Sequence, residues 1–381
     1  MTIALTGATG FLGSHLLSEL LRLNLPVIAL VRQKPQLART RLHWAVAATG
    51  AGPEQLRRLA RVRLVQADLE QPLLGLDPDA FQRLAHEIDI IWHSAAHIDL
   101  QAPEHRARRV NVDGTRRILQ LAETADRPPH LVHISSAFVA GRRPSGTVAE
   151  DDLDDTHGFV NHYEQSKYEA EVLIRDWAAT HPARVTVLRP SVLVTSRPLA
   201  PRAPRHPHAI VGARVAVLAS RGLQRLARQA GQSLPTQRMT ARIAANPHAA
   251  INILPIEYAT PALLRLATAP HPGGVRTHHV VHPTDTPATT CLQALVGDFP
   301  DLDVRTVPHL PDPTPLEELL ERLSPVAFGY LAVGRRYDRK ALNAADAAAG
   351  ITPPAPLDRA YLARTFATHS PQPEHDTEPE T

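Results

Sequence analysis

The sequence opens with a strand pattern, a glycine-rich turn and a helix pattern, and this order constrains the fold most strongly. Residues 2–6 (TIALT) are apolar and rich in β-formers, and residues 11–23 carry apolar side chains at helical spacing. Three glycines spaced three apart, Gly7, Gly10 and Gly13, mark the junction. Such a turn directs free backbone N–H groups and a helix N-terminus at one point, which suits a bound phosphate.

Strand and helix patterns continue to alternate through the first half of the chain. Buried strands are expected at 2–6, 26–31, 62–68, 88–96, 130–136 and 184–191. Alternating β and α units predict a parallel sheet with helices on both faces. We therefore predict an α/β fold, a doubly wound parallel sheet of the Rossmann type with a smaller, mostly helical substrate-binding cap.

The regular alternation ends near residue 195. Residues 196–209 are rich in Pro, Arg and His and predict a loop or lid, whereas 273–282 (GGVRTHHVVH) predict a turn into a further strand. We expect a nucleotide-binding domain over 1–195, a cap over 196–368 interleaved with the last core strands at about 251–285, and a disordered acidic tail over 369–381.

Composition narrows the class of function. Cys291 is the only cysteine, which excludes an intrachain disulfide and a cysteine metal cluster, and no metal site is predicted. The formal net charge of +3 is too small to indicate nucleic-acid binding, although a mildly basic surface suits an anionic partner. No apolar stretch approaches the ~18 residues of a membrane span. With no signal or transit peptide before the first strand, a cytoplasmic protein is expected.

Later residues supply groups for redox chemistry at a carbonyl or alcohol. Ser136 follows the fifth strand at its carboxyl end, where ligands bind in open α/β sheets. Tyr163 and Lys167 lie four apart in a helical stretch and share one face. A nearby ammonium is expected to lower the pKa of the phenol, which is otherwise too weak an acid near neutrality. Ser136 would hold the substrate oxygen and Tyr163 would exchange its proton, while a nicotinamide exchanges hydride.

The residues that follow the second strand bear on the choice of nicotinamide cofactor. An acid at this position would bind the ribose hydroxyls of NAD, whereas this chain has Arg32, with Lys34 nearby. Arg32 can pair with the 2′-phosphate of NADP, which favours NADPH; the alternative is a solvated surface arginine. Asp68, at the end of the third strand, would either accept from the adenine amine or cap a turn.

Together these motifs resemble those of the extended short-chain dehydrogenases/reductases (SDRs). The landmarks TGATGFLG, ADL, HSAA, NVDGT, ISSAFVAG, YEQSK and LRPS follow in that family's order over residues 1–195. Within it, the chain most resembles the fatty acyl reductase, male-sterility and thioester-reductase branch, through ALVR, HSAAHIDL, NILPIEYAT and RRYDRKAL. HSAAHIDL departs from the branch's usual pattern because Asp99 stands where Asn is common.

The resemblance implies the site residues. Ser136, Tyr163 and Lys167 would be catalytic, Lys167 would also reach the cofactor ribose, and Asn111 would either support the site or pack its helix. The other cofactor-binding positions would be Gly7, Thr9, Gly10, Phe11, Leu12, Gly13, Arg32, Lys34, Asp68, Leu69, Ala95, Pro190 and Ser191.

The resemblance also implies the reaction, NADPH-dependent reduction of an acyl thioester on CoA or an acyl carrier protein to an aldehyde, and in some members to an alcohol. The alternatives are an SDR oxidoreductase or epimerase acting on a free hydroxyl, ketone or nucleotide sugar, and a non-catalytic NADP-binding scaffold. Because the chain starts at the first strand, the acyl donor is expected in trans.

Residues 211–231 predict a basic amphipathic helix near the substrate entrance. One face carries Arg214, Arg221, Arg225 and Arg228. This face would dock an acidic carrier protein or the CoA phosphates, or would simply be solvated.

Overall fold

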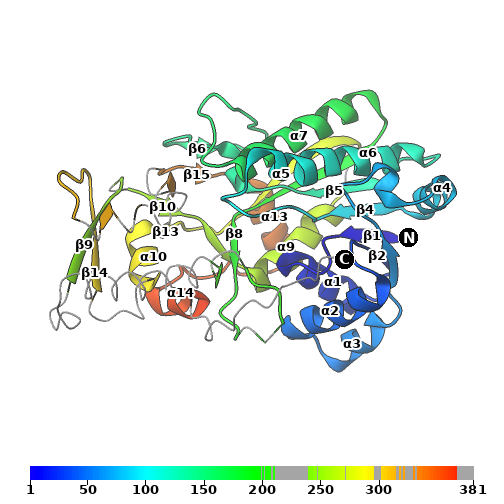
Figure 1. Ribbon diagram of the computed structural model, residues 1–381, viewed down its shortest axis with the longest axis horizontal. Helices are drawn as coiled ribbons and strands as arrows, with labels where there is room; N and C mark the ends of the chain where they lie inside the picture. The colour runs from blue at the N-terminus through cyan, green and yellow to red at the C-terminus, as the bar shows by residue number, and fades with distance from the viewer. Residues whose placement is uncertain are drawn as a thin grey trace, which may run out of the picture.

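A seven-stranded parallel sheet forms the centre of the computed structural model, in the order β12-β7-β5-β4-β1-β2-β3 (Figure 1). Its strands are β1 (Ile3–Thr6), β2 (Val27–Val31), β3 (Arg63–Gln66), β4 (Ile90–His93), β5 (His130–Ile134), β7 (Arg184–Pro190) and β12 (Gly274–Val280). The structure describes residues 1–198, 200, 202–206, 209–210, 239–246, 248–270, 272–295, 302–314, 317–318, 321, 329–330 and 333–366. The predicted doubly wound α/β fold is confirmed.

Helices cover both faces of the sheet (Figure 1). One face carries α1 (Phe11–Arg22), α2 (Pro35–Ala48), α3 (Pro53–Leu59), α9 (Ile256–Thr268) and α13 (Lys340–Ala348), and the other carries α4 (Pro78–Glu87), α5 (Glu104–Arg108), α6 (Gly114–Thr124) and α7 (His162–Thr180). Successive strand residues point to opposite faces, so Ile91 of β4 packs in one hydrophobic cluster and Trp92 in the other. Each face therefore has its own core.

The strands are shorter than their sequence patterns. β3 ends at Gln66 and β4 at His93, several residues before the predicted ends at 68 and 96. The residues that follow form loops at the carboxyl edge of the sheet, which is the edge that binds ligands in this architecture. The predicted strand at 273–282 is confirmed, because β12 pairs in parallel with β7.

The remaining described elements form small units beside the sheet. They are β6 (Thr147–Val148) paired with β15 (Arg336–Tyr337), β8 (Val192–Val194) with β11 (Ile253–Pro255), β9 (Met239–Ala244) with β14 (Leu302–Val307), β10 (Ala250–Ile251) with β13 (Thr286–Pro287), and the helices α10 (Ala288–Leu295) and α14 (Arg359–Phe366). Cys291 packs with Leu362 and Phe366 between the two helices. The predicted helix at 211–231 and the tail at 369–381 lie outside the described residues. Among the described helices, none is long and apolar enough to cross a membrane.

Candidate active site

The glycine turn forms a backbone cradle between β1 and β4, where the strand order reverses. Gly7 has a φ of +73°, and a Cβ there would stand 2.7 Å from the Ala95 nitrogen. A Cβ at Gly13 would stand 1.9 Å from the Gly7 carbonyl oxygen, so only glycine lets α1 pack against its own turn. α1 begins at Phe11 after Gly10, and no described side chain caps it. Its N-terminus is thus open toward a ligand.

A buried hydrogen-bond network holds the opposite wall of the cradle. The Thr6 hydroxyl accepts from the Ser94 and Ala95 nitrogens at 3.1 and 3.0 Å, and lies 2.9 Å from Nδ1 of His93. Nε2 of His93 lies 3.1 Å from the Thr115 hydroxyl. Burial lowers the pKa of His93 to about 3, so its ring is neutral and Nδ1 accepts from Thr6. His93 therefore holds the Ala95 loop, and Thr6 is a supporting residue that sequence reasoning missed.

The residues expected at the adenosine end lie at the ends of β2 and β3. Arg32 and Lys34 are exposed, and within the described residues neither pairs with a carboxylate. Asp68 accepts from the Glu70 nitrogen at 2.9 Å, so one carboxylate oxygen caps a turn. Leu69 packs against Gly114, where a Cβ would stand 3.1 Å from the leucine Cβ. Thr9, Phe11 and Leu12, which complete the predicted cofactor set at the turn, are partly exposed.

The three predicted catalytic residues converge at the carboxyl edge of the sheet. Ser136 lies two residues beyond β5, and its side chain lies near the phenol of Tyr163 in the first turn of α7. The Asn161 side chain caps this helix by accepting from the Glu164 nitrogen at 3.0 Å. Lys167 is buried, and its Nζ donates to the Ile134 carbonyl at 2.6 Å.

The pKa of Tyr163 is raised, whereas the sequence pattern predicted that Lys167 would lower it. Burial raises the pKa of Tyr163 to about 12, and the charge of Glu164 adds to this, while the nearby Ser136 side chain opposes it. Lys167 was expected to lower the pKa of the phenol, but its ammonium is directed to the Ile134 carbonyl and does not contribute. Burial lowers the pKa of Lys167 to about 8, against the attraction of Glu171. Tyr163 is therefore a protonated donor at neutral pH.

A buried ion pair fixes α7 to the sheet. The guanidinium of Arg189 on β7 donates to Glu171 on α7 at 2.9 and 2.7 Å, and both side chains are 0% exposed. The Ser135 hydroxyl also donates to Glu171, and Arg189 donates to the Asp152 carbonyl at 2.8 Å. Sequence reasoning missed Glu171, although its position four residues after Lys167 places it on the same helix face.

Asn111 lies in a π-helical turn, Arg109–Asp113, and ties two parts of the site together. Its side-chain amide donates to the His97 carbonyl at 3.1 Å and to the Ser166 hydroxyl at 2.8 Å, and its oxygen accepts from the His97 nitrogen at 2.7 Å. Asn111 thus joins the loop after β4 to α7. The sequence left two roles open for Asn111, packing of its helix and support of the site. The same contacts to His97 and Ser166 would serve both roles.

Comparison with known proteins decides the family. The sequence model of the family described as "Male sterility protein" matches residues 5–262. The chain belongs to the male sterility protein family. It is accordingly an NAD(P)-binding oxidoreductase with the extended SDR fold, as its motifs predicted.

Curated relatives of this male sterility family chain are much longer proteins. An isonitrile lipopeptide synthase of Streptomyces coeruleorubidus is 35% identical over 190 residues, which is 49% of this chain and 13% of the relative. The L-2-aminoadipate reductase large subunit of Penicillium chrysogenum is 31% identical over 207 residues, 49% of this chain and 14% of the relative. The chain spans only a minor part of the length of the curated relatives it matches.

Solved structures extend the likeness to nearly the whole chain. The terminal R domain from the myxalamid PKS-NRPS biosynthetic pathway has a TM-score of 0.69 and 28% identity, covering 96% of this chain and 89% of that one. MoeE5 in complex with UDP-glucose and NAD has a TM-score of 0.60 at 18% identity, covering 96% and 97%. The second likeness shows the fold alone.

The residues of this male sterility family chain fit a dinucleotide. Pro190 ends β7, and the buried Ser191 hydroxyl after it has no partner among the described residues. Nε2 of His97 is likewise buried and unpartnered. A buried polar atom without a partner costs free energy, so a polar ligand at this edge would relieve both. Together with the glycine cradle, these atoms provide the polar and backbone contacts that a dinucleotide requires.

Two other sequence features have structural roles. Glu257 accepts from the Thr195 hydroxyl at 2.6 Å and fixes the loop after β8. His278 lies 3.8 Å from a Glu150 oxygen, whereas Nε2 of His282 contacts the Ala355 carbonyl at 3.1 Å. The two histidines therefore face different neighbours.

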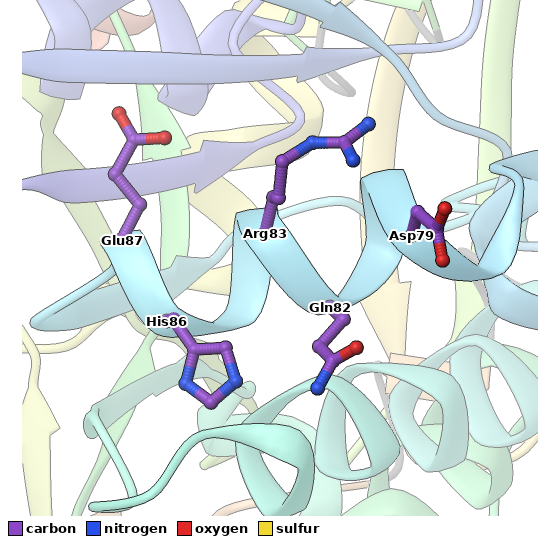
Figure 2. A pocket seen from close by; sticks show the side chains of 5 residues that line it. All are labelled: Asp79, Gln82, Arg83, His86 and Glu87. Carbon is purple, nitrogen blue, oxygen red and sulfur yellow. The ribbon is translucent and has the colours of Figure 1, made fainter.

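A surface hollow on α4 lies apart from these residues. Figure 2 shows the five side chains that line it, Asp79, Gln82, Arg83, His86 and Glu87, all projecting from one helix. Glu87 pairs with Arg63 at 2.6 Å, and both side chains are about half exposed. Exposed ion pairs of this kind contribute little to the stability of the fold. None of the residues that line the hollow belongs to the predicted site.

Proposed function

We propose that this chain reduces an acyl thioester, carried on CoA or an acyl carrier protein, to an aldehyde with NADPH. The observation that carries the proposal is the convergence of Ser136 and Tyr163 at the carboxyl edge of the sheet, beside the glycine cradle. The likeness to a terminal R domain at 28% identity, and to an aminoadipate reductase, favours a thioester over a ketone as substrate.

Ser136 and Tyr163 would both donate hydrogen bonds to the thioester carbonyl oxygen. These bonds strengthen as negative charge develops on that oxygen, so they stabilise the transition state more than the ground state. When bound, NADPH supplies the hydride that adds to the carbonyl carbon. Tyr163, which burial keeps protonated, transfers its proton to the oxygen and gives a hemithioacetal. Collapse of the hemithioacetal breaks the C–S bond and releases a thiol and an aldehyde.

Positively charged side chains would orient the cofactor. Lys167 is buried at the end of β5, and its ammonium would contact the nicotinamide ribose. Arg32 and Lys34 would bind the 2′-phosphate, which supports NADPH over NADH. A second round of reduction would convert a retained aldehyde to an alcohol and would consume a second NADPH.

A substrate panel tests the proposed function. The protein is incubated with NADPH and acyl-CoA, acyl carrier protein thioesters, ketones or nucleotide sugars, while thiol release and NADPH oxidation are followed together. We expect both signals only with thioesters. Tyr163→Phe should lose ~10²–10⁴-fold in rate, the contribution of a positioned acid, while it keeps NADPH binding.

The same panel separates the alternatives. NADPH oxidation with ketones or nucleotide sugars alone would establish an SDR oxidoreductase, whereas conversion of a nucleotide sugar to its epimer without net NADPH oxidation would establish an epimerase. Thiol release without NADPH oxidation would indicate a hydrolase. NADPH binding with no turnover on any substrate would leave the scaffold reading.

A further inference from the structure

Tyr330, from the C-terminal half of the chain, contacts the start of α7, which carries Tyr163, and the turn that follows Ser136. Its hydroxyl donates to Oε1 of Glu164 at 2.6 Å and accepts from Nδ2 of Asn161 at 3.0 Å. Its ring packs edge-on against Phe138, with centroids 5.1 Å apart and planes at 69°. Glu164 directly follows Tyr163, and Phe138 lies two residues after Ser136. One side chain therefore contacts a neighbour of each catalytic residue.

Glu164 is an unusual carboxylate because it is 0% exposed. Oε2 accepts from the Val160 nitrogen at 2.9 Å, and Tyr330 satisfies Oε1. A buried carboxylate is stable only when its oxygens have such partners. Burial raises the pKa of Glu164, and the Tyr330 hydrogen bond acts against this, as do the charges of Arg335 and Arg142.

The titratable groups around Glu164 come from several elements. Arg142 follows the turn after Ser136, Tyr163 shares α7, and Tyr330, Arg335 and Tyr337 come from the C-terminal segment. The negative charge of Glu164 adds to the rise in the pKa of Tyr163 that burial causes, so the two side chains are electrostatically coupled. Tyr330 also lies within electrostatic range of Tyr163 itself.

The segment around Tyr330 is anchored at further points. Arg335 donates to the Gly141 carbonyl, and its guanidinium lies 5.8 Å from the centre of the Phe138 ring. β15 pairs in parallel with β6, and the two lie side by side in Figure 1. A Cβ at Gly329 would stand 2.7 Å from a methyl of Val160, so the backbone packs directly on the loop before α7. Phe138 thus contacts both Tyr330 and Arg335.

We propose that Tyr330 is a positioning residue for the catalytic pair, acting on Tyr163 through Glu164 and on the Ser136 turn through Phe138. The inference deepens the proposed function and rests on it. Tyr330 performs no chemistry. Its hydroxyl holds the start of α7 through Asn161 and Glu164, and its ring fixes that helix start relative to the turn after Ser136. Correct packing of Tyr330 would therefore be required for Tyr163 to transfer its proton efficiently to the substrate.

Kinetics of conservative variants form the first half of the test. Tyr330→Phe removes only the hydroxyl, and we expect kcat to fall about 10-fold, the effect of one hydrogen bond to a charged group, with an unchanged Kd for NADPH. Tyr168→Phe is the matched control. Tyr168 lies on α7, as Tyr163 does, but its ring packs on Phe159. An unchanged kcat in Tyr330→Phe, or an equal loss in Tyr168→Phe, would overturn the proposal.

The second half of the test measures the titration of the Tyr163 phenol by NMR and needs no substrate. The protein is labelled with ¹³C at the tyrosine Cζ, and the Tyr163 signal is assigned by its loss in Tyr163→Phe. Glu164→Gln should move the onset of its titration to lower pH by about one unit, because a neighbouring negative charge is removed. Tyr330→Phe should shift the same signal at neutral pH, and Tyr168→Phe should not.

The two halves distinguish the possible failures. If the wild-type protein reduces no thioester, the proposed function fails, and the NMR titration still decides the role of Tyr330. If Tyr330→Phe does not fold, Glu164→Gln carries the test. A Tyr163 signal that is identical in the wild type and Glu164→Gln would overturn the proposal whatever the activity.

Discussion

Charge placement at single residues decides the cofactor preference that we propose. Arg32 is exposed at the end of β2, and the described residues place no carboxylate against it. An arginine–phosphate pair is charge-assisted and often bidentate, so Arg32→Ala should cost ~1.5–3 kcal/mol of NADPH binding. Titration of both nicotinamide cofactors with wild type and variant measures this. Tighter binding of NADH by the wild type, or equal NADPH affinity in both proteins, would refute the assignment.

Lys167 gives the site a defined pH dependence. Burial lowers its pKa to about 8, so the ammonium is retained below pH 8 and lost above it. Because the ammonium is the form that would contact the cofactor ribose, kcat/KM for NADPH should fall about tenfold per pH unit above that value. Lys167→Arg keeps its charge throughout this range and should abolish the decline. The same decline in Lys167→Arg would show that another group titrates.

At the scale of elements, α7 is oriented by the Arg189–Glu171 pair. Both side chains are fully buried, and removing one partner leaves the other charge without compensation. Arg189→Met should therefore lower the free energy of unfolding by about 3–5 kcal/mol in urea titrations. Arg189→Met combined with Glu171→Leu should recover part of that loss.

A surface pair provides the control for this prediction. Arg57 pairs with Glu54 at 2.5 Å, but the side chains are 71% and 53% exposed. Arg57→Met should leave the free energy of unfolding nearly unchanged, because water screens an exposed pair. Similar losses in Arg57→Met and Arg189→Met would contradict the role given to the buried pair.

Elements with local signals were predictable from the sequence. The strand patterns at 26–31 and 130–136 correspond to β2 and β5 because buried parallel strands are continuously apolar. The glycine spacing predicted the cradle, since the clashes that forbid a Cβ at Gly7 and Gly13 arise within one turn and its neighbouring strand. The site residues were predictable for the same reason. Ser136 follows β5, and α7, which carries Tyr163 and Lys167, comes after it, so the order of elements indicates the carboxyl edge of the sheet.

Contacts between distant segments were not predictable. Tyr330 and Glu164 are 166 residues apart, and nothing local to either residue indicates their hydrogen bond. The pairing of β9 with β14 and of β6 with β15 depends in the same way on how the C-terminal segments return. The raised pKa of Tyr163 has the same origin, because it follows from burial and from the direction in which Lys167 points.

For the whole molecule, the fold places the glycine turn and the Tyr163 phenol at the carboxyl edge of the sheet, and Tyr330 packs against the start of α7 and the turn after Ser136. The order of strands brings the turn after β1 beside the loop after β4. β5 is the next strand in the sheet, and α7 follows it along the chain. This arrangement supports the proposed reduction of a carbonyl group. The identity of that carbonyl is the central claim of the proposed function.

Isotope transfer tests this claim most directly. The protein is mixed with NADPH that carries deuterium at the transferred position and with an acyl thioester, and the product is examined by mass spectrometry while free thiol is titrated. We expect one deuterium on the former carbonyl carbon of each aldehyde, with one thiol released per NADPH oxidised. Thiol release without deuterium in the product, or deuterium transfer only to ketones or sugars, would contradict thioester reduction.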